Sequence, residues 1–94
     1  MHFWVYILEN PSGRFYIGQT DDLARRVTEH NDPNREASKY TKKHAGPWRL
    51  VWSEEHNSRS SAMQREKQIK AMKSARWIRE ELLSQAVDRQ SSPD

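Results

Sequence analysis

The chain has 94 residues, enough for one small domain, and carries a net charge of +3 with an isoelectric point of about 9.4. It contains no cysteine, which excludes disulfide bonds and thiolate metal sites. Its mean hydropathy is −1.12. No stretch approaches the roughly 20 apolar residues that cross a bilayer, and the short N-terminal apolar run does not resemble a signal peptide, so we expect a cytoplasmic protein without membrane contact.

The first third of the chain predicts a β-hairpin followed by a helix. Residues 3–8 and 15–18 are aromatic and β-branched, as strands are, and the Pro-Ser-Gly segment between them is typical of a turn. Thr20 is placed to cap a helix whose first turn holds two aspartates. The apolar positions of this helix predict that it runs to about His30.

The rest of the chain predicts a third strand and two further helices after a polar loop. The expected elements are a loop over 32–47, a strand over 49–53, a helix over 60–72 with its cap among residues 58–60, and a helix over 75–86 capped by Ser74. The order ββαβαα indicates an α+β fold with helices packed on a small sheet. We expect one domain over residues 1–86 and a disordered tail over residues 87–94.

Glu66 is the acidic residue that the helical pattern singles out. At about 100° per residue, it falls on the same stripe as Ala62 and Ile69, so it faces the apolar side of its helix. An unpaired carboxylate is costly there. Its spacing alone favours an ion pair with Lys70 or Lys73. The alternative is a metal ligand, because a carboxylate on a rigid helix suits a magnesium-like ion.

The two strand tyrosines, Tyr6 and Tyr16, share a sheet face only if the hairpin loop has an odd number of residues. A simple two-residue turn would put them on opposite faces. Two strand tyrosines are most often core aromatics with a solvated hydroxyl. On the first helix, Arg26 could form a surface ion pair with Asp22, one turn before it. Alternatively, its guanidinium could bind a phosphate bidentately.

Two one-signed stretches suit a polyanion such as nucleic acid. Between Ser58 and Arg79 there are seven basic residues and one acidic residue, Glu66, and a second basic group follows the first helix. The candidates for nucleic-acid contact are Lys39, Lys42, Lys43, Arg65, Lys70 and Lys73. The histidines His30, His44 and His56 have wide, irregular spacing, which makes them a weak zinc pattern.

The order of these elements resembles that of the GIY-YIG nuclease family. Trp4-Val5-Tyr6 is followed by Tyr16-Ile17-Gly18, with Tyr16 ten residues after Tyr6. Asp22-Leu23-x-x-Arg26 then falls on a helix, and Arg65-Glu66 on a later helix. The match extends over about residues 3 to 80 and is closest to the compact, single-domain bacterial branch of the family.

The resemblance implies a three-stranded antiparallel sheet flanked by helices, with a site that cuts DNA, including branched or damaged DNA, on one sheet face. Tyr6 and Tyr16 match the two motif tyrosines, one of which activates the attacking water. Arg26 matches the arginine that stabilises the transition state. His30 falls where relatives place a histidine or tyrosine near the site, and Glu66 matches the ligand of a single Mg²⁺ or Mn²⁺.

The sequence also departs from the family pattern. Trp4 and Val5 stand where the first motif has Gly and Ile, and Gln19 stands where excision-repair relatives carry a lysine. No attached DNA-binding domain is apparent, so this domain or a protein partner would supply target choice. Two alternatives to a nuclease are a non-catalytic nucleic-acid-binding module on the same scaffold, and an adaptor that docks through exposed aromatics such as Trp48 or Trp52.

Overall fold

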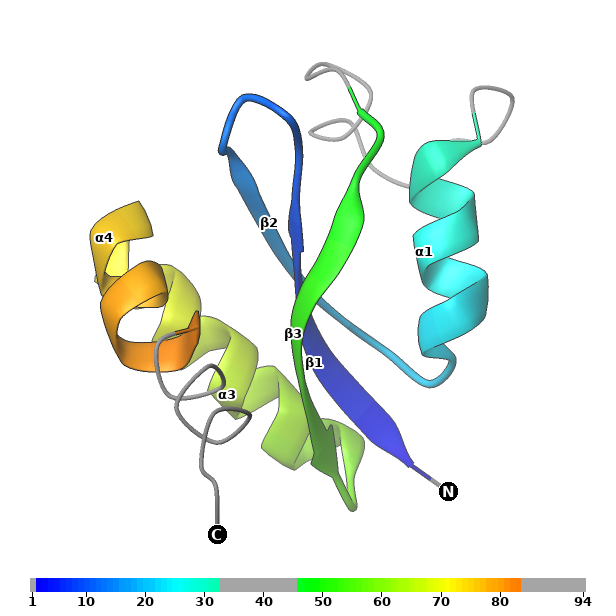
Figure 1. Cartoon of the computed structure of the whole chain (residues 1–94). Helices are drawn as coiled ribbons and strands as arrows, with labels where there is room; N and C mark the ends of the chain where they lie inside the picture. Colours follow the sequence, from blue (N-terminus) through cyan, green and yellow to red (C-terminus); the bar gives the residue numbers. More distant parts are fainter. Residues whose placement is uncertain (1, 33–45, 84–94) are drawn as a thin grey trace, which may run out of the picture.

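A computed structural model of the chain describes residues 2–32 and 46–83 (Figure 1). Its elements, in chain order, are β1 (Phe3–Glu9), β2 (Phe15–Thr20), α1 (Leu23–Asn31), β3 (Arg49–His56), α3 (Arg59–Met72), α4 (Ala75–Trp77) and the π-helix η1 (Ile78–Leu83). The predicted α+β class and the order ββαβαα are confirmed.

The three strands form one antiparallel sheet in the order β2-β1-β3, so β1 is central and both other strands are edges. Helix α1 covers one face of this sheet and α3 covers the other, as Figure 1 shows. Because side chains alternate along a strand, odd-numbered positions of β1 face α3 and even-numbered positions face α1. Each face has its own hydrophobic cluster.

The face toward α3 holds the larger cluster. Its buried members are Val5, Ile7, Ala62, Ile69, Ile78 and Leu82. The cluster toward α1 is smaller and more polar, with Tyr6, Leu8 and Trp48 buried, and Tyr16, Leu23 and Val27 packed against them. Full burial of one aliphatic side chain contributes roughly 1.5–3 kcal/mol. The α3 face therefore supplies most of the hydrophobic stabilisation, and the α1 face is left able to hold polar groups.

The hairpin loop between β1 and β2 decides where the two tyrosines point. Glu9 pairs with Phe15, which leaves five residues in the loop. The buried carboxamide of Asn10 organises this loop, because its Oδ1 accepts hydrogen bonds from the backbone N–H groups of Ser12 (3.1 Å) and Arg14 (2.8 Å). Gly13 takes the left-handed conformation with φ of 82°. The loop length is odd, so Tyr6 and Tyr16 share one face.

Several element boundaries differ from the sequence prediction. Helix α1 is capped by Asp22, whose carboxylate accepts a hydrogen bond from the backbone N–H of Arg25 (3.1 Å). The predicted cap, Thr20, instead ends β2 and binds the backbone of Asp22. Strand β3 continues to His56, beyond the predicted end at 53, because its polar residues lie on an exposed edge.

The predicted third helix also differs in form. It begins after the Ser74 cap as expected, but it changes to a π-helix at Ile78. Ile78 and Leu82 are buried in the core, and their four-residue spacing does not distinguish the two helix types. Residues 84–86 and the predicted tail over 87–94 lie outside the described residues.

Asn31, the last residue of α1, joins this helix to the start of β3. Its Nδ2 donates to the carbonyl of Trp48 and its Oδ1 accepts from the N–H of Trp48, both at 2.7 Å. The indole of Trp48 is 2% exposed, which contradicts the expectation that it offers a docking surface. Lys39, Lys42, Lys43 and His44 lie outside the described residues. No helix within the described ranges has the length and apolar character needed to cross a membrane.

Replacing Asn31 by Ala should lower the free energy of unfolding by about 1–3 kcal/mol, because two hydrogen bonds that close α1 onto β3 are lost. Urea unfolding followed by tryptophan fluorescence measures this change. Asn57→Ala, at an exposed position in the turn before α3, is the matched control and should change stability by less than about 0.5 kcal/mol. Equal losses in the two variants would contradict the role of Asn31.

Candidate active site

Gly18 on β2 makes room for two aromatic rings on the α1 face. It pairs with Tyr6 across the strands. A Cβ atom at Gly18 would lie 2.6 Å from the Tyr6 hydroxyl oxygen and 3.0 Å from Cε2 of Tyr16. Such contacts are closer than carbon and oxygen atoms tolerate, so any other residue would push the Tyr6 ring away. The glycine therefore fixes how deeply the Tyr6 hydroxyl is set into this face.

Tyr6, Tyr16 and His30 form a compact aromatic cluster above Gly18. The Tyr6 hydroxyl oxygen lies 2.9 Å from Nε2 of His30, and both residues are at least 95% buried. The ring centroids of Tyr16 and His30 are 4.7 Å apart, and those of Tyr6 and Tyr16 are 6.2 Å apart. The structure thus brings together three of the residues that the sequence singled out.

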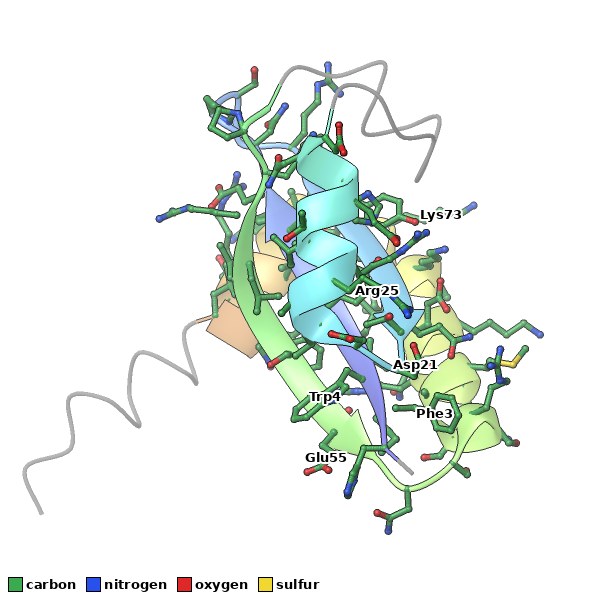
Figure 2. The ribbon with its side chains drawn as sticks, turned by 90° about the vertical axis from the view of Figure 1, so that its right-hand side faces the viewer. Phe3, Trp4, Asp21, Arg25, Glu55 and Lys73 are labelled. Carbon is green, nitrogen blue, oxygen red and sulfur yellow. The ribbon has the colours of Figure 1, made fainter. Side chains whose placement is uncertain are left out.

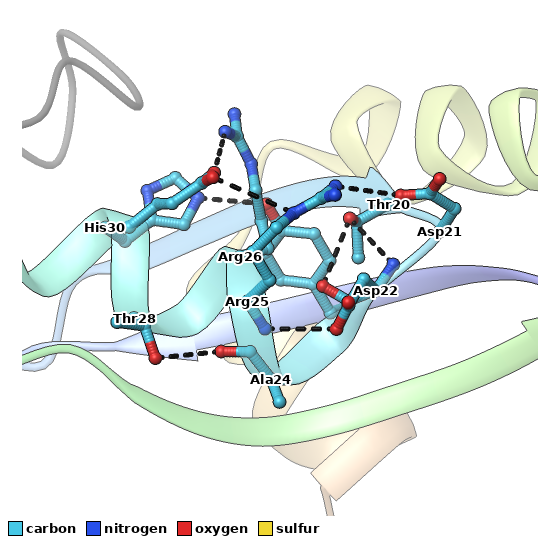
Figure 3. Close-up of polar contacts among 10 residues, drawn as sticks. Thr20, Asp21, Asp22, Ala24, Arg25, Arg26, Thr28 and His30 are labelled. Carbon is cyan, nitrogen blue, oxygen red and sulfur yellow. Dashed lines mark hydrogen bonds and ion pairs between the residues drawn. The ribbon is translucent and has the colours of Figure 1, made fainter.

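Arg26 joins this cluster from α1, one turn before His30. Its guanidinium forms an ion pair with Glu29 (2.9 Å) and hydrogen-bonds the Tyr6 hydroxyl. The surface pair with Asp22 that the spacing offered is replaced, because Asp22 caps the helix. The neighbouring Arg25 turns to the exposed side and pairs with Asp21 (2.9 Å), as Figure 3 shows.

The electrostatics of the cluster keep Tyr6 and His30 neutral. Burial raises the pKa of Tyr6 well above its usual value, although the hydrogen bond from Arg26 opposes this effect. Burial and the Arg26 charge lower the pKa of His30 to about 4. Since Arg26 can only donate, the Tyr6 oxygen accepts from it. In the tautomer of neutral His30 that carries its proton on Nδ1, the Tyr6 hydroxyl donates to Nε2.

Glu66 approaches the cluster from α3, the helix that contacts both β1 and β2. Its negative charge raises the pKa of Tyr6 further, so it lies within electrostatic reach of that hydroxyl. The neighbours on its stripe, Ala62 and Ile69, are buried as predicted, and the Glu66 side chain is 18% exposed. Nζ of Lys70 lies 2.8 Å from its Oε2, so the predicted ion pair is present as well.

A metal ion at this site would depend on few protein ligands. Among the described residues, no group of three or more His, Cys, Asp or Glu side chains could hold a metal. The described part of the weak zinc pattern is not assembled. His30 lies on α1 and contacts Tyr6 of the sheet, whereas His56 contacts Glu54 and Ser61 near the start of α3. The partly exposed carboxylate of Glu66 fits Mg²⁺, which is usually bound by one or two carboxylates together with waters and substrate phosphates.

The described basic candidates divide between the two edges of the sheet. Arg65 lies over β3, where its Nε is 3.0 Å from Glu54 and its guanidinium covers the Trp52 ring. These contacts give Arg65 a structural role away from β2. Lys70 and Lys73 lie beside β2, and Figure 2 shows Lys73 at the edge of the sheet opposite β3.

The sequence reasoning missed three residues that shape the site. Glu29 orients Arg26, and the i,i+3 spacing of the two residues was the available signal. Gly18 was noted only as part of a motif, and its packing against Tyr6 depends on the strand register. Arg14 lies near Lys70 and Lys73 only because the hairpin folds back toward α3.

Comparison with known proteins gives a consistent result. The family model described as the GIY-YIG catalytic domain matches residues 2–79. A UPF0213 protein from Halobacterium salinarum is 41% identical over 71 residues, which cover 76% of this chain and 88% of the relative. A UPF0213 protein from Streptococcus pneumoniae is 36% identical over 86 residues, which cover 92% and 82%.

A solved structure agrees with these sequence matches. It is the solution NMR structure of the UPF0213 protein BH0048 from Bacillus halodurans, which is 34% identical. It matches with a TM-score of 0.52 over 99% of this chain and 89% of that protein. With its motif tyrosines gathered around Gly18 and its catalytic-domain match over residues 2–79, the chain belongs to the GIY-YIG family, among the small UPF0213 proteins.

Proposed function

We propose that this protein is a metal-dependent endonuclease that hydrolyses DNA phosphodiester bonds by a tyrosine-assisted mechanism with one metal ion. The observation that carries the proposal is the buried Tyr6–His30 hydrogen bond, with Arg26 on the same oxygen and the charge of Glu66 acting on it. The match to the GIY-YIG catalytic domain supports a nuclease. The substrate, the metal and the residue roles below are part of the proposal.

In this mechanism Tyr6 acts as a proton relay. Its raised pKa keeps the phenol protonated, so it does not rest as a tyrosinate. As the attacking water bonds to phosphorus, one of its protons passes to the Tyr6 oxygen, and the Tyr6 proton passes to Nε2 of His30. The bond between phosphorus and the leaving oxygen breaks in the same step, and the leaving oxygen takes up a proton from solvent. His30 ends as imidazolium, which the negative phosphate stabilises. Tyr16 packs against His30 and holds the ring in place for this transfer.

Arg26 and Glu66 stabilise negative charge in this mechanism. The transition state of phosphodiester hydrolysis carries extra charge on the non-bridging oxygens, and a guanidinium fixed beforehand by Glu29 can bind it without reorganising. Glu66 would hold the Mg²⁺ or Mn²⁺ ion. When bound, this ion supplies charge stabilisation at the leaving oxygen. Lys70 is positioned to move from the carboxylate to a phosphate when the substrate arrives.

The basic residues of α3 and of the segment that follows it favour DNA, including branched or damaged DNA, as the polyanion. We further propose that a protein partner supplies target choice. The competing function is a nucleic-acid-binding module without catalysis, and the cleavage experiments below distinguish the two.

Glu66→Gln should lower the rate of Mg²⁺- or Mn²⁺-dependent cleavage by about 100-fold or more, because the carboxylate that holds the ion becomes neutral. Cleavage is measured on labelled duplex, single-stranded, flap and four-way-junction DNA. DNA binding should stay within about threefold, since the variant removes a negative charge from the protein.

The matched control is Glu80→Gln. Glu80 also pairs with a basic residue four positions away, Arg76, but its side chain is 60% exposed. This variant should cleave at the wild-type rate. Full activity of Glu66→Gln would overturn the metal assignment. Salt-sensitive binding by the wild type without cleavage of any substrate would favour the binding module.

Arg26→Lys should lower kcat by about 100-fold while KM changes by less than about threefold, because lysine keeps the charge but loses the bidentate geometry. Arg49→Lys, at a 77% exposed arginine that pairs with Glu9 on the sheet, should leave both constants unchanged. The two variants are compared by steady-state kinetics on the preferred substrate. A rise in KM alone in Arg26→Lys would show that Arg26 binds substrate without stabilising the transition state.

His30 should make stability depend on pH. Its pKa is lowered to about 4 in the folded state, so the unfolded state binds the proton more readily. The stabilisation is complete above the usual histidine pKa of about 6.5, and it is lost as the pH falls toward 4. Its size is about 3 kcal/mol.

Urea unfolding of the wild type and of His30→Gln between pH 4 and 7.5 measures this dependence. The stability difference between the two proteins should shrink by about 3 kcal/mol on acidification, since glutamine does not titrate. His56→Gln, which alters a histidine on β3, should keep the wild-type dependence. Parallel curves for the wild type and His30→Gln would show that His30 is not held neutral.

A further inference from the structure

A groove lies between the edge strand β2 and the C-terminal half of α3. Its volume is about 320 Å³, within the range of roughly 300–1,000 Å³ that is usual for ligand sites. The hairpin loop forms one wall, and Arg79 of η1 braces this wall by donating to the Gly13 carbonyl (3.2 Å) and lying over the Phe15 ring. The wall is therefore fixed to the helices on the far side of the groove.

The groove has an apolar floor and a basic rim. Ile17 and Ile69 contribute to its floor, Phe15 stands in the wall that Arg79 braces, and the exposed side chains of Arg14, Lys70 and Lys73 form its rim. None of the residues that line it is acidic. No acidic side chain in the described ranges forms an ion pair with Arg14 or Lys73, so both positive charges are open to a ligand. A ligand that matches both features has a flat apolar part and a negative charge.

The groove adjoins the proposed active site. Lys70 lines it, and the same ammonium group contacts Glu66, the proposed metal ligand. On a helix that rises about 1.5 Å per residue, Lys73 lies roughly 10 Å beyond Glu66 along the axis. This distance is of the order of one or two nucleotides from a phosphate bound at Glu66. The inference that follows therefore rests on the proposed nuclease function.

We propose that this groove is a subsite for one unstacked nucleotide next to the scissile phosphate. The base would lie on the apolar floor, and its phosphate would lie between Arg14 and Lys73. Aromatic and apolar surfaces beside a basic groove are the way in which proteins hold unpaired strands. A duplex keeps its bases stacked inside and offers only phosphates, so the groove favours DNA with an unpaired segment.

The test uses a double variant that removes two of the three rim charges, those of Arg14 and Lys73, by substitutions that suit the local backbone. Arg14→Gln changes an exposed side chain, while its backbone bonds to Asn10 remain. Lys73 has a left-handed backbone with φ of 49°, which asparagine adopts more readily than most residues, so Lys73→Asn is compatible with the helix end. Lys70 is left intact because it contacts Glu66.

Binding is measured without metal by fluorescence anisotropy, with a labelled oligothymidylate of about twelve nucleotides and a duplex of the same length. The double variant should bind the single strand about tenfold more weakly, and its salt dependence should fall by about 1.4 in log–log slope. Affinity for the duplex should change by less than about threefold.

The control double variant, Arg49→Gln with Lys67→Gln, removes the same charge from exposed positions outside the groove. It should leave the preference for the single strand unchanged. Equal losses in the two double variants, or equal losses on duplex and single strand, would overturn the subsite, because they would report only the net charge.

A change in the ligand tests the apolar floor without a change in the protein. An oligonucleotide with abasic sites at its central positions keeps the phosphates and loses the bases. The wild type should bind it about tenfold more weakly than the intact strand. Equal affinity would overturn the base-binding role of the floor.

Failure of the subsite and failure of the proposed function give different results. If the wild type cleaves DNA but the groove variant keeps single-strand affinity, the subsite is wrong and the nuclease stands. If the groove variant loses single-strand affinity but no DNA is cleaved, the subsite stands and the nuclease function is wrong.

Discussion

The arrangement of the α1 face depends on the contact between the Tyr6 hydroxyl and the bare backbone at Gly18. A side chain on Gly18 would meet that hydroxyl at 2.6 Å, so the absence of one sets the depth of the ring. At this depth the hydroxyl meets His30 and Arg26, both of which come from α1. The strand pairing and the helix position are thereby tied to a single oxygen atom, and the other polar groups are arranged around it.

This arrangement explains why the smaller cluster tolerates polar groups. A buried hydroxyl or imidazole is costly unless it is hydrogen-bonded, and here each satisfies the other. No buried side-chain polar atom in the described ranges lacks a hydrogen-bond partner. The apolar cluster on the opposite face carries most of the hydrophobic burial. The α3 face therefore carries most of the apolar burial, and the α1 face holds the hydrogen-bonded polar cluster.

Much of the fold followed from the sequence, because hydrophobic periodicity and turn residues are local signals. The face shared by Tyr6 and Tyr16 was left open, since it depends on a one-residue difference in loop length. The Asn10 carboxamide settles that length through two bonds to its own loop. The position of Asp22 as the cap was missed because Thr20 is equally suitable by type, and only the end of β2 decides between them.

The site was less accessible to sequence reasoning than the fold. The order of the residues indicated which side chains belong to the candidate site. Which of them contact one another depends on how the helices and strands pack, and the sequence does not give that packing. Glu66 illustrates this, because its spacing offered an ion pair or a metal ligand, and only the structure shows that the ion pair with Lys70 forms while the charge of Glu66 also acts on Tyr6. Arg65 illustrates the reverse: it is adjacent to Glu66 in sequence, but its contacts are with β3. Neighbours on a helix point in different directions, so adjacency along the chain did not indicate a shared role.

The pair of hydrogen bonds between Asn31 and Trp48 has a consequence for how much the chain length between these two residues can vary. These two hydrogen bonds join the chain on either side of residues 33–45 and fix the end of α1 against the start of β3. Loop-closure entropy rises only by about 0.6 kcal/mol for each doubling of loop length. A change in the length of the chain between these two anchors should therefore cost little free energy of unfolding, while the Asn31–Trp48 bonds keep α1 and β3 in the same arrangement.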